Sequence, residues 1–305
     1  MAKTKEISRR IKSVSNTKKI TKAMEMVAAS KMRKAVEAVL KTRTYANLSW
    51  EMVLRLAKIS AGNNEIGHPL LTKKKEIKKA ALILISSNRG LCGGFNTAVI
   101  NRAKESLKKH NLETDIILVG KKGSIMAQQK YNIVAEFPKS DLVLSESETN
   151  PIARMAIADY LSGKYDKVML VYTDFVNGVK QIPRIKQLLP INIESQDQYL
   201  GMTEKEEKEK KHSQPEECTY EYTFEPTPTE VLDRIVPRLI EVQLYQALLE
   251  SNASEHSARM AAMHQATESA SDMVNELTLF YNKARQSNIT AEIAEISAGA
   301  NAQQN

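Results

Sequence analysis

Residues 86–96, with the sequence SSNRGLCGGFN, have the composition most suggestive of a chemical site. Three glycines and a cysteine follow a short apolar segment and precede an amphipathic one, which is where phosphate-binding loops lie in α/β proteins. The segment lacks both GK[ST] and GxGxxG, so a nucleotide loop would be missing its usual lysine and hydroxyl. It could bind an anion or nucleotide, or form a tight strand-to-helix turn packed under another element. We expect the turn.

The cysteines and histidines give no pattern typical of catalysis or metal binding. Cys92 has no His/Asp arrangement near it in the sequence, so we expect a structural thiol rather than a nucleophile. Cys92 and Cys218 form no CxxC motif, which is typical of a reducing compartment. His256 and His264 lie eight residues apart, on similar faces of one helix but out of reach of one metal ion. We therefore expect no catalytic residue, no metal and no cofactor.

The first 61 residues could bind an acidic partner, because they carry 15 Lys+Arg against 4 Asp+Glu. The basic residues of this stretch include Arg9, Arg10, Lys12, Lys18, Lys19, Lys22, Lys31, Arg33 and Lys34. Nucleic acid, an acidic protein surface and plain solvent are the three alternatives for what faces them. No aromatic residue precedes Tyr45, so base stacking is unavailable there, which argues against nucleic acid.

Two long helices at the chain ends must position these residues. Neither 1–61 nor 238–298 contains Gly or Pro. At about 1.5 Å per residue, the second stretch would be roughly 90 Å long, which is too long for one compact core. The two stretches have nearly equal length, and their net charges of +11 and −4 favour pairing. We predict an antiparallel two-helix coiled coil.

Apolar or small residues at alternating spacings of three and four predict the contact seams of both helices. In the C-terminal helix they are Leu232, Ile235, Leu239, Val242, Gln246, Leu249, Ala253, His256, Met260, Met263, Thr267, Ala270, Val274, Leu277, Tyr281 and Ala284. In the N-terminal helix they are Ile7, Ile11, Val14, Ile20, Met24 and Val27, then Met32, Val36, Leu40, Tyr45, Leu48, Met52, Leu56 and Ile59. After Ala284 the apolar residues thin to Ile289, Ile293 and Ile296, which indicates either a fraying terminus or a tip that touches a surrounding surface without adhering to it.

The middle of the chain alternates strand and helix patterns, which predicts a small α/β domain with right-handed crossovers. The expected strands are 80–85, 115–119, 133–137 and 167–173, with an edge strand at 181–193 and a short returning strand at 220–224. The expected helices are 97–110, 121–131 and 151–161. Between 194 and 230 the chain holds 11 Asp+Glu against 4 Lys, which predicts a solvated loop.

The predicted fold is therefore α/β with long helices: a coiled coil made of both chain ends plus a central Rossmann-like α/β domain. Its expected parts are 1–61 (coiled-coil helix), 76–228 (α/β domain with a foot and an acidic insert) and 229–305 (coiled-coil helix). The longest apolar run, at 80–85, is far too short to span a bilayer, and the basic N-terminus lacks the apolar core of a secretory signal. Any membrane association would have to go through a partner.

Several runs resemble the gamma subunits of bacterial F-type ATP synthases over nearly the whole length. They are EISRRIKSVSNTKKITKAMEMVAASKMRKA, SSNRGLCGGFN, YDKVMLVYTDFVN with QLLPI, SARMAAMHQATESASDMV and LFYNKARQSNITAEIAEISAGA. The resemblance implies the central-stalk rotor of a proton-translocating enzyme, a non-catalytic chain that couples rotation of a membrane c ring to ATP synthesis or hydrolysis in an alpha/beta hexamer. The alternative is a basic coiled-coil protein that binds nucleic acid.

The resemblance also implies functional residues and partners. Rotor contacts to the hexamer would be Met24, Lys31, Arg33, Arg259, Gln286, Thr290 and Glu292, and the foot would be Tyr222, Phe224 and Glu225. The partners would be three alpha and three beta subunits, an epsilon subunit and the c ring, without nucleic acid. The chain would lie peripherally, at the cytoplasmic face of a bacterial cell membrane. Two departures stand out: the acidic insert at 204–217 is longer than expected, and the cysteine pair of the plastid thiol switch is absent.

Overall fold

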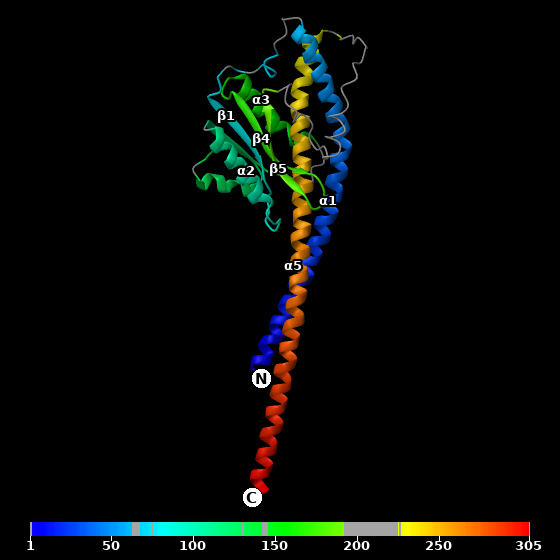
Figure 1. The fold of residues 1–305 in the computed structure, drawn as a ribbon, viewed down its shortest axis with the longest axis vertical. Coiled ribbons are helices and arrows are strands. Elements are labelled where there is room, and N and C mark those ends of the chain that lie inside the picture. Colours follow the sequence, from blue (N-terminus) through cyan, green and yellow to red (C-terminus); the bar gives the residue numbers. More distant parts are fainter. Residues whose placement is uncertain are drawn as a thin grey trace. The chain divides into compact units, whose positions relative to one another are not determined.

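The computed structural model describes residues 2–62, 68–72, 74, 76–110, 112–129, 131–141, 146–191, 225 and 227–304. The chain divides into two compact units: Met1–Ala28 with Met260–Asn305, and Ala29–Arg259. Two long helices, α1 (Ala2–Gly62) and α5 (Pro228–Gln304), contribute to both units (Figure 1). The predicted returning strand and most of the acidic segment lie outside the described residues.

A five-stranded sheet forms the centre of unit Ala29–Arg259, in the order β3-β2-β1-β4-β5. The strands are β1 (Lys79–Ile85), β2 (Glu113–Val119), β3 (Asn132–Phe137), β4 (Lys167–Phe175) and β5 (Gln181–Leu189). The first four are parallel, and β5 is an antiparallel edge strand on β4. Pro183 is tolerated within β5 because an edge strand need not donate every backbone N–H. The predicted mixed α/β architecture is confirmed.

Helices cover both faces of the sheet, as the apolar strand β1 requires. One face packs against α2 (Phe95–His110), with Val99 and Ala103 in its core. The other face packs against α3 (Asn150–Leu161) and the first half of α5 (Figure 1). The predicted α-helix at 121–131 is instead the 3-10 helix η1 (Lys121–Gln129). Its first turn is bonded to the turn after β1, with Lys122 N donating to Ser87 O at 2.9 Å.

From Val242 to Ser257 every residue of α5 is buried, because the sheet, α1 and the segment after β3 surround this part of the helix. Two serines of this stretch form hydrogen bonds to strand β4. Ser251 Oγ accepts from Thr173 N at 3.2 Å, and Ser254 Oγ donates to Thr173 O at 3.3 Å. These small side chains let the helix backbone approach β4 closely.

The N-terminal seam follows the prediction only in part: Ile7, Ile11, Val14, Met24, Met32 and Val36 are among the less exposed residues of α1, as predicted. Ile20, Val27, Leu40, Tyr45, Leu48 and Met52 are all about half exposed or more, whereas Ala28, Ala35, Val39, Trp50 and Val53 are buried. The side chains of Leu56 and Ile59 lie outside the described residues. Two of the five buried residues, Ala28 and Ala35, have small side chains that a pattern of large apolar residues does not mark. At the six exposed positions, the less exposed face of α1 departs from the predicted seam.

Within unit Met1–Ala28 with Met260–Asn305, the two helices form an antiparallel pair. Thr267 Oγ1 donates to Thr21 Oγ1 at 2.8 Å, and Lys18 Nζ donates to Ser271 Oγ at 2.9 Å. As residue numbers rise along α1 they fall along α5, which defines the antiparallel direction. In α5 the predicted seam is confirmed, since Met263 and Ala270 are buried and seam positions from Met260 to Ala284 are the less exposed ones.

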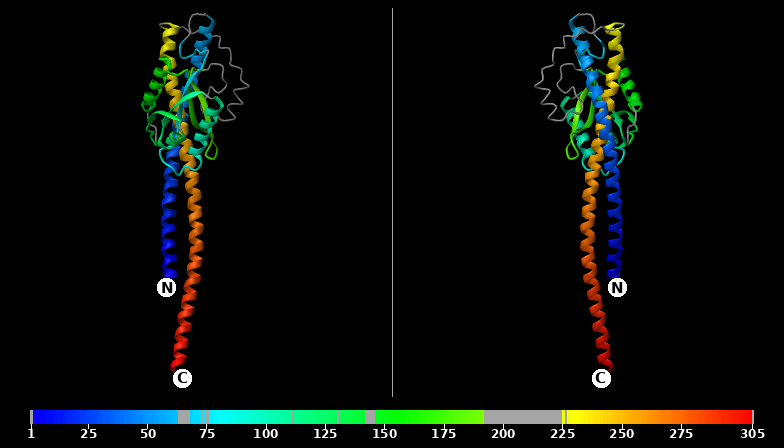
Figure 2. Two further views of the ribbon diagram at one scale, coloured as in Figure 1. Left: turned by 90° about the vertical axis from the view of Figure 1, so that its left-hand side faces the viewer. Right: turned by 90° about the vertical axis from the view of Figure 1, so that its right-hand side faces the viewer.

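The two helices are less equal in length than the sequence indicated, at 61 residues for α1 and 77 for α5. Helix α5 begins at Pro228 and continues through Pro237, because buried Val236 and Leu239 hold this turn against the core. At its other end α5 extends past the start of α1, and residues 289–299 are all exposed (Figure 2). The tip of α5 is exposed because α1 does not extend alongside it, and because many of its own side chains are small.

Candidate functional site

The turn at 86–96 is closed by its own side chains. Asn96 Oδ1 accepts from Ser87 N at 3.0 Å, and Asn96 Nδ2 donates to Cys92 Sγ at 3.2 Å. Cys92 is buried, as expected for a structural thiol. Arg259 of α5 donates to the carbonyl oxygens of Arg89 at 3.4 Å and Gly90 at 3.3 Å. A phosphate loop presents backbone N–H groups to its ligand, whereas this turn presents carbonyl oxygens to a guanidinium.

Two buried residues fix the base of the same turn. Ser86 Oγ donates to Gly120 O at 2.9 Å and accepts from Gly123 N at 2.9 Å. Gly120 has φ +95, and a Cβ there would lie 2.4 Å from Ser86 O, so only glycine fits. The turn is thereby joined to the end of β2 and to η1.

A buried ionic cluster, which the sequence reasoning missed, lies beside this turn. Lys139 Nζ lies 2.6 Å from Glu255 Oε2, with side chains 2% and 6% exposed. Arg259 NH2 lies 2.8 Å from Glu255 Oε1, so one carboxylate is held by two cations. Burial raises the pKa of Glu255, but the two cations outweigh it and hold the pKa below its ordinary value. Removing one member of such a buried pair costs about 3–5 kcal/mol.

His256 extends the cluster toward the segment after β3. Its Nε2 lies 2.8 Å from the carbonyl oxygen of Asp141, so Nε2 donates, and Nδ1 accepts from Arg259 at 3.3 Å. This is the neutral imidazole, and burial lowers the pKa of His256. The sequence contained one signal for the cluster, the i,i+4 spacing of Glu255 and Arg259. Nothing local to Lys139 indicated that it would be buried.

The seven predicted contact residues fall into three groups. Met24 is half-buried in the helix pair and Arg33 is exposed. Lys31 and Arg259 have partners inside the chain: Lys31 Nζ lies 2.8 Å from Asp141 Oδ2. The remaining three, on the last part of α5, are exposed and are Gln286, Thr290 and Glu292.

The predicted foot is described only at Glu225, which is exposed. Tyr222 and Phe224 lie outside the described residues. Across the described ranges no group of three or more His, Cys, Asp or Glu could hold a metal ion. No helix in the same ranges is long and apolar enough to cross a membrane.

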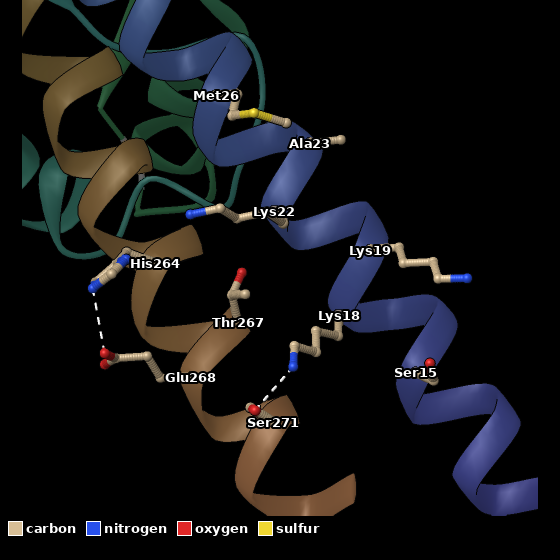
Figure 3. Close-up of a pocket in the computed structure, with 10 residues that line it drawn as sticks. All are labelled: Ser15, Lys18, Lys19, Lys22, Ala23, Met26, His264, Thr267, Glu268 and Ser271. Carbon is tan, nitrogen blue, oxygen red and sulfur yellow. Dashed lines mark hydrogen bonds and ion pairs between the residues drawn. The ribbon is translucent and has the colours of Figure 1, made fainter.

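A groove of about 660 Å³ lies between α1 and α5 in unit Met1–Ala28 with Met260–Asn305 (Figure 3). Its lining residues are Ser15, Lys18, Lys19, Lys22, Ala23, Met26, His264, Thr267, Glu268 and Ser271. Lys18 points across the groove to Ser271, whereas Lys19 points away from it (Figure 3). Lys22 holds the pKa of Glu25 below its ordinary value, and His264, 3.3 Å from Glu25, adds to this effect. The groove is thus a largely basic surface with its own internal ion pairs.

Comparisons with known proteins identify the family. The sequence model of the ATP synthase family matches residues 3–303. The chain is 42% identical to the ATP synthase gamma chain of Pelotomaculum thermopropionicum, covering 98% of this chain and 99% of that one. It is also 42% identical to the gamma chain of Roseiflexus castenholzii, covering 98% of each chain.

Solved structures with the same fold come from mitochondrial ATP synthases. A chain of the central stalk and c ring from Tetrahymena thermophila matches with a TM-score of 0.58 at 24% identity, covering 81% of this chain and 99% of that chain. A chain of the OSCP/F1/c-ring structure from Euglena gracilis matches with a TM-score of 0.63 at 18% identity, covering 99% and 95%. These relatives lend no support to the nucleic-acid alternative. The chain therefore belongs to the ATP synthase gamma chain family.

Proposed function

We propose that this chain turns as a shaft inside a hexamer of three alpha and three beta subunits and performs no chemistry itself. The observation that carries this proposal is the helix pair whose longer member continues alone past residue 288. A single helix without a partner leaves all its faces available to a surrounding ring. Apart from Ile289, Ile293 and Ile296, its side chains are mostly small or polar, which limits adhesion, so the tip can pass from one subunit to the next.

The proposed contacts to the hexamer lie on the two helices. Met24 and Arg33 contact the beta subunits from α1, and Gln286, Thr290 and Glu292 contact the hexamer from the tip of α5. Lys31 and Arg259 belong to the same set. Each already forms an ion pair within the chain, so they hold neighbouring parts of this chain in position rather than form new ion pairs with the hexamer. The basic groove of Figure 3 suits an acidic protein surface.

The foot carries the proposed contacts to the membrane part of the enzyme. Tyr222, Phe224 and Glu225 would contact the epsilon subunit and the c ring. Association with the membrane would then be indirect, at the cytoplasmic face of a bacterial cell membrane. Proton flow would turn the ring and this chain together.

The turn at 86–96 supports a non-catalytic role, because Arg259 occupies its carbonyl oxygens from the α5 side. We expect isothermal titration of the isolated chain with ATP to give no heat of binding.

The decisive experiment uses inverted membrane vesicles that contain the assembled enzyme. Met24→Lys places a charge in the half-buried side of the helix pair, and we expect ATP hydrolysis to continue while ATP-driven proton pumping falls. Met24→Leu is the matched control, since it keeps an apolar side chain of similar size, and it should pump normally. Normal pumping in the Met24→Lys vesicles would refute the assignment.

A further inference from the structure

The segment 139–141, which follows β3, lies against both long helices within unit Ala29–Arg259. On the α5 side, Lys139 pairs with Glu255 at 2.6 Å, and the carbonyl oxygen of Ser140 accepts from Asn252 Nδ2 at 3.2 Å. On the α1 side, Asp141 pairs with Lys31 at 2.8 Å. One short segment of the α/β domain is thus bonded to α1 and α5 together.

The turn at 86–96 joins the same arrangement from the other side. Asn88 Nδ2 donates to the carbonyl oxygen of Lys139, and Lys139 Nζ lies 5.5 Å from the centre of the Phe95 ring. Arg259 connects the turn to Glu255, because it bonds both Gly90 O and the carboxylate. The segment, the turn and α5 therefore share one network.

We propose that 139–141 is a clasp that makes the α/β domain turn with α1 and α5, and that Glu255 is its central positioning residue. This inference rests on the rotor function proposed above. It assigns to Lys31 and Arg259 a role inside the chain, at the point where each helix is bonded to the domain.

The position and chemistry of the clasp suit the transmission of torque. On α5, unit Ala29–Arg259 ends at Arg259, which forms an ion pair with Glu255. On α1, the unit begins at Ala29, two residues before Lys31. Beyond these residues the helices belong to the other unit. The close packing between the sheet and α5 transmits strain, and the buried ion pairs add contacts of fixed direction to it. A buried carboxylate between two cations has a fixed geometry, so it resists displacement in a defined direction.

The test measures protons pumped per ATP hydrolysed in inverted vesicles, after confirming that each variant chain is present in the assembled enzyme. Glu255→Gln keeps the shape but leaves Lys139 and Arg259 without their shared charge, and the pumping ratio should fall by about threefold or more. Asp141→Asn breaks only the half-exposed pair with Lys31, and the ratio should fall by about one third. Asp159→Asn is the matched control. It breaks the 2.9 Å pair with Lys164, which bonds neither long helix, and should leave the ratio unchanged.

Each result has a defined meaning. An unchanged ratio in assembled Glu255→Gln enzyme overturns the clasp, and so does an equal fall in the Asp159→Asn control. If Glu255→Gln fails to assemble, Asp141→Asn decides, and an unchanged ratio in that variant overturns the clasp. Met24→Lys is measured alongside. If Met24→Lys lowers the pumping ratio while Glu255→Gln does not, the clasp is wrong and the rotor function stands. If neither variant changes the pumping ratio, the rotor function fails.

Discussion

Replacing Thr173 by valine should stabilise the joint between the sheet and α5, although it removes a polar group from the middle of that joint. Thr173 lies on β4, is 3% exposed, and bonds α5 through its backbone, with Ser251 and Ser254. Within the described part of the chain, no group forms a hydrogen bond with its side-chain oxygen. Valine keeps the β-branched shape and both backbone bonds.

The expected change in the free energy of unfolding follows from the cost of burying that hydroxyl oxygen without a partner. A buried polar group without a partner costs about 1–3 kcal/mol, so replacing it by a methyl group should raise the free energy of unfolding by about 1 kcal/mol. For a chain of this size the unfolding temperature should rise by roughly 2–3 °C. Thr173→Ser keeps the hydroxyl and removes the methyl group, and should lower the stability by about 1 kcal/mol.

Urea unfolding followed by tryptophan fluorescence measures both variants. Trp50 is the single tryptophan of the chain, is 4% exposed, and packs in the same core as β4 and α5, so its emission reports on this unit. A midpoint for Thr173→Val at or below that of the parent chain would refute the reasoning. It would mean that the hydroxyl has a partner, such as a buried water, whose bond is worth more than its burial costs.

Three further predictions use other features of the fold. Gly120→Ala should lower the free energy of unfolding by about 3 kcal/mol in the same assay, because its Cβ would lie 2.4 Å from Ser86 O at φ +95. His256 has a pKa lowered by burial, so its contribution to stability is complete above the ordinary value of about 6.5 and is lost as pH falls toward the lowered value. His256→Gln should therefore lose less stability than the parent chain between pH 7.5 and about 5.5, by at most about 1.4 kcal/mol, because only about one pH unit of that interval lies below 6.5. Ending the chain at Asn288 should leave the free energy of unfolding within about 0.5 kcal/mol of the parent value, since the residues removed through 299 are exposed; a larger loss would show that the tip packs against the chain.

Much of the fold could be predicted from local patterns. The absence of Gly and Pro from both chain ends predicted long helices, and alternating spacings in α5 predicted its seam through Met263 and Ala270. The apolar run of β1 predicted a strand covered on both faces. These features depend on residues close in sequence, whose periodicity reflects the backbone repeat directly.

The less exposed face of α1 was predicted at Ile7, Ile11 and Met24, but at other positions it was decided only in the tertiary structure. Ile20 and Val27 are 60% and 54% exposed, although their size and spacing favoured burial. Ala28 and Ala35 are buried instead, at 2% and 4% exposed. Size predicts which residues gain most from burial, but the shape of the partner helix decides which face fits.

The buried cluster at Glu255 depended even more on the fold. Lys139 and Glu255 are separated by 116 residues and meet only because β3 ends beside α5. A lysine after a strand is ordinarily solvated, and it becomes a buried ion partner only where the sheet carries it onto a helix that presents a carboxylate. Local sequence determined that this protein would consist of two long helices and a sheet. The tertiary packing alone decided which charged residues would be buried between them.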